Sequence, residues 1–195
     1  NISITNTFVN GSIGGGIYLA ASYSHANNII ITNSTLNSSR SDRDALGGAI
    51  YWNGADSSMN NITIYNASAN YNYASGTKEA NGGAIYVSGS NVQMTNIYIY
   101  NSSAIADNGK AHGGAICRIN VNNNVNNLLA NITIHNSYAY GNTGGAIAWY
   151  AAGSTFNNVT IINSTLNSTG HYDVSGGPIY TESDRKSGSA GMPRP

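Results

Sequence analysis

Charged residues stand three positions ahead of a glycine pair that recurs along the chain. Asp44 and Glu79 hold this position in two successive repeats, and Lys110 holds it in the next. Carboxylates on adjacent turns of a repetitive fold would share one surface, and such pairs cleave glycosidic bonds as acid and base. The alternative is an exposed ladder of the neighbours Arg43–Asp44 and Lys78–Glu79, worth under about 1 kcal/mol per pair. We expect no complete catalytic apparatus, and Asp44 and Glu79 are its only candidates.

The other residues that could bind metals or perform catalysis form no pattern. Four histidines, His25, His112, His135 and His171, fall at different positions of the repeat, and Cys117 is the only cysteine. A disulfide within the chain and a thiolate metal cluster are therefore excluded. The glycine pairs are not followed by the Lys-Ser/Thr of a phosphate-binding loop. We expect neither a metal nor a cofactor.

Four tyrosines share one outward position, directly after the isoleucine of the glycine-containing repeat; Tyr180 is separated from the first three by Cys117 and Ala148, and the first three are the candidates for binding. These three are Tyr18, Tyr51 and Tyr86. A column of aromatic rings can stack on sugar rings, which would suit a carbohydrate-binding adhesin. The same column can also be cross-strand packing between neighbouring strands. Both interpretations stay open.

The composition excludes several classes of protein. Only 8% of residues are charged, against about a quarter in an ordinary soluble domain. The formal net charge of +0 leaves no basic footprint for nucleic acid. No apolar run approaches the roughly 20 residues that span a membrane. Disordered chains lack aromatic and β-branched residues, whereas this chain has 14 tyrosines and many isoleucines, which favours a β architecture.

Two short motifs alternate along the whole chain. The first reads GGAIY or a close variant and begins at Gly14, Gly47, Gly82, Gly113, Gly144 and Gly176. The second reads NITIxNS or a close variant and begins at Asn1, Asn28, Asn61, Asn96, Asn131 and Asn158. The spacing from the first motif to the second is nearly constant, as from 47 to 61, while the return spacing varies. Insertions confined to one side of a repeat are typical of solenoids.

Alternation of polar and apolar residues inside both motifs predicts β-strands. We expect the isoleucines of both motifs, and Trp52 and Trp149, to point inward, with further apolar residues supplying a third side. The sequence therefore predicts an all-β fold over residues 1–182, a single right-handed parallel β-helix of about five to six coils with three strands per coil. Residues 183–195 leave the repeat and form a C-terminal tail.

One asparagine per repeat shares the phase of the inward isoleucines. These residues are Asn6, Asn33, Asn66, Asn101, Asn136 and Asn163. An unpaired amide in an apolar core costs a few kcal/mol, so we expect a structural asparagine ladder, in which each amide bonds to the next at a turn. Several asparagines also lie in N-x-S/T sequons, and Asn37 and Asn167, placed on loops, are the glycosylation candidates.

The alternating GGAI and asparagine-bearing strands resemble the chlamydial polymorphic membrane proteins and the adhesin-like surface proteins of methanogenic archaea. Both are similar to the pectate-lyase-like class of right-handed β-helices. The resemblance covers roughly residues 1–182, although the chlamydial Phe-x-x-Asn half is replaced here by Ile-x-Asn. It implies a secreted or cell-surface protein that works in adhesion or as a structural stalk.

Two functions are therefore expected. The first is a non-catalytic extracellular structural protein, either a self-assembling head-to-tail filament subunit or a section of a cell-surface stalk. Its partner is another copy or the neighbouring repeats of a longer chain, because an uncapped edge coil invites pairing. The alternative is a carbohydrate-active β-helix that binds or cleaves polysaccharide, with glycans as partners.

Overall fold

The computed structural model of the protein describes residues 1–73, 78–107, 109–119, 125–140, 143–167 and 175–181. All structural statements below concern these residues, so the expected tail at 183–195 lies outside them. The described chain is built from strands and turns. Within it there is no helix of the length and hydrophobicity needed to cross a membrane.

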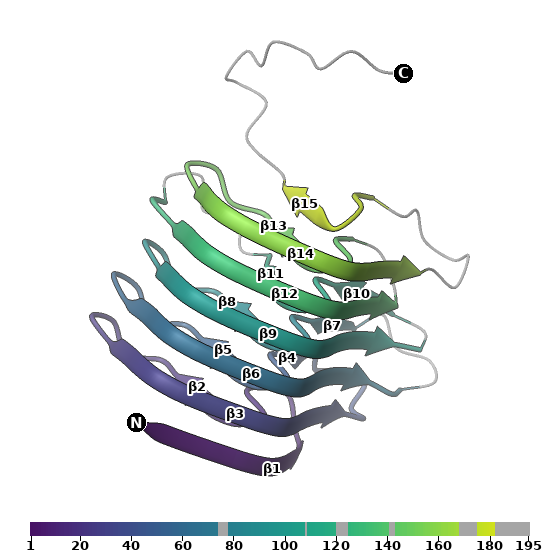
Figure 1. The fold of residues 1–195 in the computed structure, drawn as a ribbon. Coiled ribbons are helices and arrows are strands. Elements are labelled where there is room, and N and C mark those ends of the chain that lie inside the picture. Colours follow the sequence, from purple (N-terminus) through teal and green to yellow (C-terminus); the bar gives the residue numbers. More distant parts are fainter. Residues whose placement is uncertain (74–77, 108, 120–124, 141–142, 168–174, 182–195) are drawn as a thin grey trace, which may run out of the picture.

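The strands form three parallel sheets (Figure 1). The long sheet contains β1 (Ile2–Asn10), β3 (His25–Ser38), β6 (Ser58–Tyr71), β9 (Gln93–Ala106), β12 (Leu128–Tyr140) and β14 (Thr155–Asn167). The short sheet contains β4 (Ala45–Leu46), β7 (Glu79–Asn81) and β10 (Lys110–His112). The third sheet contains β2 (Ile17–Leu19), β5 (Ile50–Trp52), β8 (Ile85–Val87), β11 (Ile116–Arg118), β13 (Ile147–Trp149) and β15 (Ile179–Thr181).

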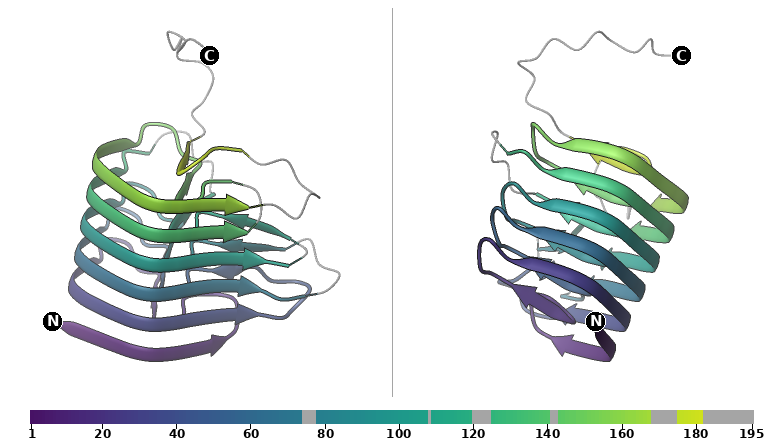
Figure 2. Two further views of the ribbon diagram at one scale, coloured as in Figure 1. Left: turned by 45° about the vertical axis from the view of Figure 1, so that its right-hand side comes forward. Right: turned by 60° about the vertical axis from the view of Figure 1, so that its left-hand side comes forward.

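Each strand pairs in parallel with the strand at the same place in the neighbouring coil. Ile50 pairs with Ile85, for example, and Ile85 pairs with Ile116. In Figure 1 the near strands run from left to right, the chain returns behind them, and later coils lie above earlier ones. The helix is therefore right-handed, as parallel crossovers almost always are. The prediction of a three-sided parallel β-solenoid is confirmed, and Figure 2 shows the stack from two further sides.

The number of coils was overestimated: the solenoid has about four turns rather than five to six. Within the described residues, three coils carry a strand of the short sheet, and isolated bridges such as Ile13 with Leu46 and His112 with Thr143 lie at the corresponding place in other coils. The return spacing differs between these coils. It is only 13 residues from 1 to 14 and from 131 to 144, but 17 to 21 in the coils that contain β4, β7 and β10.

Two asparagines with left-handed backbone bend each long strand from β3 onward, and β1 contains one, Asn6. In β3 these are Asn28 and Asn33, with φ of 58° and 54°, and the pairing with β6 skips both residues. Asparagine tolerates this conformation better than most side chains because its short polar group bonds locally. The bends wrap the long sheet around the core, as the curved ribbons of Figure 2 show.

The bends also correct the predicted phase of the asparagine column. At each bend the inward and outward alternation shifts by one residue, so that Ile31 and Ser34 both point inward while Asn33 between them is exposed. The asparagines of this column therefore lie at a corner of the surface and not in phase with the core. The residues that do point inward after the bend are small, such as Ser34 and Ala67.

The interior is filled by stacked columns of apolar side chains. The isoleucines of the third sheet, including Ile85 and Ile116, belong to one buried cluster with those of the long sheet, including Ile64 and Ile99. Each of these four is at most 1% exposed. Trp52 and Trp149 are buried in the same cluster, so their predicted core position is confirmed.

The second glycine of each GGA motif pinches the interior into two compartments. A Cβ on Gly83 would lie 2.1 Å from the Gly114 carbonyl oxygen and 2.4 Å from the backbone of Ser103 on the long sheet. Only glycine permits this approach, because the two walls meet backbone to backbone. Beyond the pinch a smaller cluster fills the space between the long and short sheets, with Leu36, Tyr71 and a set of alanines.

Candidate functional site

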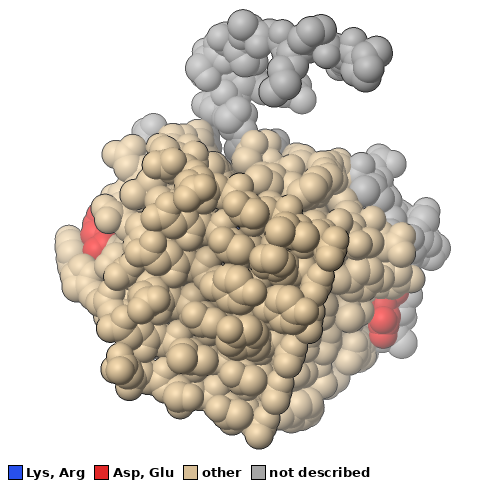
Figure 3. Space-filling view, viewed as in Figure 1, with Lys and Arg blue, Asp and Glu red and all other residues tan. Residues whose placement is uncertain are grey.

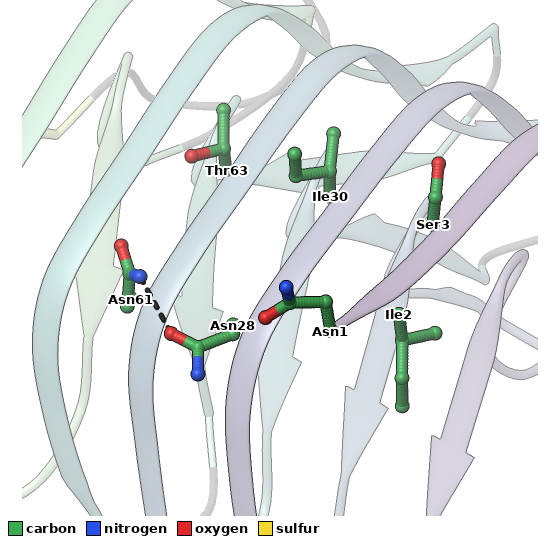
Figure 4. Close-up of a pocket in the computed structure, with 7 residues that line it drawn as sticks. All are labelled: Asn1, Ile2, Ser3, Asn28, Ile30, Asn61 and Thr63. Atoms are coloured by element: carbon green, nitrogen blue, oxygen red, sulfur yellow. Dashed lines mark hydrogen bonds between the residues drawn. The ribbon is translucent and has the colours of Figure 1, made fainter.

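The first coil leaves one end of the main core uncovered. Ile4, Ile17 and Leu19 pack on the core but are only partly buried, and Ile2 is 52% exposed. The depression between these residues and Ile29 has a volume of about 500 Å³. One water molecule occupies about 30 Å³ of liquid, so the opening has room for several apolar side chains. Figure 4 shows Asn1 and Ile2 at this end, beside the hydrogen bond that joins Asn61 to Asn28.

The predicted asparagine column forms a hydrogen-bonded ladder along the long sheet. Asn33 donates from Nδ2 to Oδ1 of Asn6 at 2.9 Å. The same bond, at 2.9–3.1 Å, joins Asn66 to Asn33, Asn101 to Asn66, Asn136 to Asn101 and Asn163 to Asn136. The donor always lies one coil later than the acceptor, so the ladder has a polarity. Within the described structure it ends with the Asn6 amide nitrogen at one side and the Asn163 amide oxygen at the other.

A second ladder follows the first asparagine of each NITI motif, and the sequence analysis did not assign it a role. Asn61 donates to Asn28 at 2.7 Å (Figure 4), and the bond recurs from Asn131 to Asn96 and from Asn158 to Asn131. Asn96 departs from the pattern and donates to Asn60. The invariable asparagine at this motif position was the signal that could have revealed the ladder.

Replacing Asn101 with Ala is expected to destabilise the solenoid by about 2–3 kcal/mol. Asn66 and Asn136 lose their common partner, which costs about 1 kcal/mol at a surface where water substitutes. Alanine must also hold a φ of 53°, and left-handed backbone costs roughly 1–2 kcal/mol for a residue with Cβ. Asn101→Gly keeps the backbone and loses only the rung, so urea unfolding of the two variants separates both effects. Two variants as stable as the wild type would contradict a stabilising ladder.

The candidate tyrosine column is closed to ligands over most of its area. Tyr18 stacks on Tyr51 with ring centroids 5.3 Å apart, and Tyr51 stacks on Tyr86 at 5.5 Å, with interplanar angles of 19° and 17°. The faces of these rings are thus occupied by each other. Tyr86 is buried, and only Tyr18, which is 56% exposed, has a ring face outside the stack. This column is mainly cross-strand packing.

The two candidate carboxylates lie near each other but hold different partners. Oδ1 of Asp44 accepts a hydrogen bond from the backbone nitrogen of Glu79 at 2.9 Å. The Glu79 side chain accepts a hydrogen bond from Asn81 at 3.2 Å and lies 3.8 Å from Nε2 of His112. Asp44 thus orders the backbone of β7. The two residues do not form a matched acid and base pair on an open surface.

Glu79 lies at one end of a row of polar side chains, continued by His112, Thr143 and Tyr150, that the sequence did not reveal. His112 bonds through Nδ1 to the hydroxyl of Thr143, which lies 2.9 Å from the hydroxyl of Tyr150. Burial opposes ionisation of Glu79, but the nearby His112 imidazole, the hydrogen bond from Asn81 and the charge of Lys110 outweigh it and hold the pKa of Glu79 below its usual value. The sequence did not reveal this row of side chains because segments of variable length precede Glu79, His112 and Thr143.

The order of hydroxyl, imidazole and carboxylate in this row is one that enzymes use to activate a nucleophile. Here the Glu79 oxygen at 3.8 Å is beyond hydrogen-bond distance. His112 and Thr143 are also buried, so a substrate does not reach them in this conformation. The arrangement therefore ties β7, β10 and the next coil together.

The two glycosylation candidates lie at the ends of long strands and not on loops. Asn37 is the penultimate residue of β3, and its Oδ1 accepts a hydrogen bond from Asn70 at 2.9 Å. Asn167 is exposed at the end of β14, and the rest of its sequon lies outside the described residues. In the described part of the chain no group of three or more His, Cys, Asp or Glu is arranged to hold a metal ion.

Comparison with known proteins adds no relative to this description. No family model, no curated protein and no solved structure matches the chain.

Proposed function

We propose that this chain is a non-catalytic extracellular structural solenoid whose first coil stacks on a coil of the same kind, either the last coil of another copy or a neighbouring repeat of a longer stalk. The uncovered core at β1 and β2 carries the proposal. An edge strand that presents apolar side chains and unpaired backbone N–H and C=O groups favours pairing with another chain. The sequons, the low charge and the resemblance to surface proteins support a place outside the cell.

The first and last coils have matching patterns. If β1 of one copy continues the long sheet beyond β14 of another, every column is extended by a residue of its own kind. The pairs that would meet are Ile2 with Val159, Ile4 with Ile161, Asn6 with Asn163 and Val9 with Leu166. In the third sheet Ile17 would meet Ile179, and Tyr18 would meet Tyr180. One register therefore satisfies both sheets.

The polarity of the ladder selects a head-to-tail arrangement. The amide nitrogen of Asn6 would donate to the amide oxygen of Asn163 in the next copy, repeating the bond of every rung inside the chain. Two first coils facing each other would oppose amide nitrogens to amide nitrogens. A head-to-tail contact that does not close into a ring generates a filament.

Gly177 provides the test, because its Cβ position is open. In four earlier coils a Cβ on the second glycine would lie within 2.4 Å of the same glycine's carbonyl oxygen in the next coil, but at Gly177 no atom of the described residues lies within 4 Å. Gly177→Ala should therefore leave the melting temperature of the single chain nearly unchanged. In a stacked pair, its methyl group would meet the Gly15 carbonyl of the next copy.

We expect fibres of the wild type in negative-stain images, and none of Gly177→Ala. The variant keeps its first coil, so it should add to the end of a wild-type fibre and block further growth. A small fraction of variant should then shorten wild-type fibres. The proposal fails if the concentrated wild type sediments as a monomer, or if the variant forms fibres equally well.

A further inference from the structure

A second group of aromatic side chains covers the outer face of the long sheet, between the two asparagine ladders. We call it the tyrosine face: Tyr65 on β6, Tyr98 and Tyr100 on β9, and His135 on β12. The ring centroid of Tyr65 lies 5.9 Å from that of Tyr98 and 6.3 Å from that of Tyr100. The centroid of His135 lies 5.7 Å and 6.1 Å from the same two centroids. The rings therefore form one continuous patch over three coils.

The geometry of the tyrosine face differs from that of the stacked column on the third sheet. Its rings are tilted against one another by 39–59°, so their faces are not closed by neighbours. Tyr65 is 39% exposed, and the other three rings are partly exposed. Cross-strand packing alone would be satisfied by the closed stack that Tyr18, Tyr51 and Tyr86 adopt.

The surroundings of the tyrosine face are polar but uncharged. Apart from His135, the outward positions between the ladders hold no ionisable group other than the tyrosines: Ser3, Thr5, Ile30, Thr32, Thr63, Thr133, Thr160 and Ile162. Figure 3 views this face, where no Lys or Arg is visible among the described residues and carboxylates appear only at the margins. An anionic ligand would find no cation here to compensate its charge.

The ladders provide hydrogen-bonding rims on both sides of the patch. A carboxamide has two N–H groups, and a rung uses one of them. Asn61 and Asn96 flank the patch on one side, and Asn66 and Asn101 flank it on the other, all four exposed. Each rim thus presents a donor once per coil, at intervals of about 4.8 Å.

We propose that the tyrosine face binds an uncharged, extended polysaccharide. The C–H groups of a pyranose ring pack on the negative face of an aromatic ring, and its hydroxyl groups accept hydrogen bonds from the amides of the rims. Tyrosine suits such a surface because it supplies a large contact area with little side-chain entropy to lose. The site does not depend on head-to-tail stacking, since it lies on the middle coils.

Binding should be measured by affinity electrophoresis and by co-sedimentation, with soluble xylan and mannan, insoluble cellulose and chitin, and polygalacturonate as the acidic member. We expect the wild type to bind at least one of the neutral polymers and not polygalacturonate. Tyr98→Ala with Tyr100→Ala should weaken that binding at least tenfold. Tyr18→Ala, which alters the stacked column, serves as the matched control and should bind like the wild type.

Tyr65→Ala covers the case in which the double variant is unfolded, because Tyr65 is the most exposed ring of the patch. It should also weaken binding, with an unchanged circular dichroism spectrum. The proposal is overturned if no neutral polymer binds, if only polygalacturonate binds, or if Tyr65→Ala binds as well as the wild type. It is also overturned if the tyrosine variants lose only lateral association of the chains, since the patch would then be a contact between copies.

Discussion

Replacing Ile85 with Asp is expected to unfold the solenoid. Ile85 is completely buried at the centre of the third sheet, between Ile50 and Ile116. The substitution removes apolar burial worth roughly 1.5–3 kcal/mol and places an unpaired carboxylate in the core, which costs several kcal/mol more. The sum is comparable to the whole stability of a typical domain, about 5–15 kcal/mol.

Circular dichroism and urea unfolding of Ile85→Asp would measure this effect. Ile30→Asp is the matched control. It makes the same substitution on the outer face of β3, where the Ile30 side chain is 49% exposed. We expect this control to lose less than about 1 kcal/mol. If both variants unfold at the same urea concentration, the inward and outward assignment of the strands is wrong.

Gly83→Ala should have the second largest effect, although it adds a single methyl group. The new carbon would overlap the Gly114 carbonyl oxygen at 2.1 Å and the Ser103 backbone at 2.4 Å. Neither neighbour is a flexible side chain, so three segments of backbone must separate and the pinch between the compartments must open. We expect a loss of several kcal/mol, well above the roughly 1 kcal/mol of an average substitution.

The same substitution at Gly177 is the control for this prediction too. There the methyl group enters open space, and the reduced freedom of the unfolded chain should leave stability unchanged or raise it by up to about 1 kcal/mol. Thermal unfolding of the two variants tests the difference. Equal melting temperatures would show that the interior adapts to a side chain at the pinch.

The fold could be predicted because the isoleucine columns repeat at every coil, and because only strands give their alternation a common inner face. The phase of Asn33 could not be predicted by alternation, since a left-handed residue shifts it by one. Nor could the pinch at Gly48 or Gly83, because a close approach of two backbones leaves no apolar signature in either segment.

The candidate site was harder to predict than the fold for a related reason. The Tyr18 column was visible because its members follow a fixed motif at a fixed distance. His112 and Thr143 meet after return segments of different lengths, so their contact exists only in three dimensions. Tyr98 and His135 do share columns with other rings, but whether their faces are stacked or tilted depends on side-chain torsions and not on spacing.

The glycine pinch makes the thickness of the rod independent of its length. The thickness of the rod is set inside each coil, where Gly83 holds the long sheet against the bend between the short and third sheets. The number of coils is set by how often the motif pair is repeated, and each coil contacts only its neighbours. Duplication or loss of one motif pair in the gene would therefore change the reach of the rod while its girth, its corners and its outer faces stay the same.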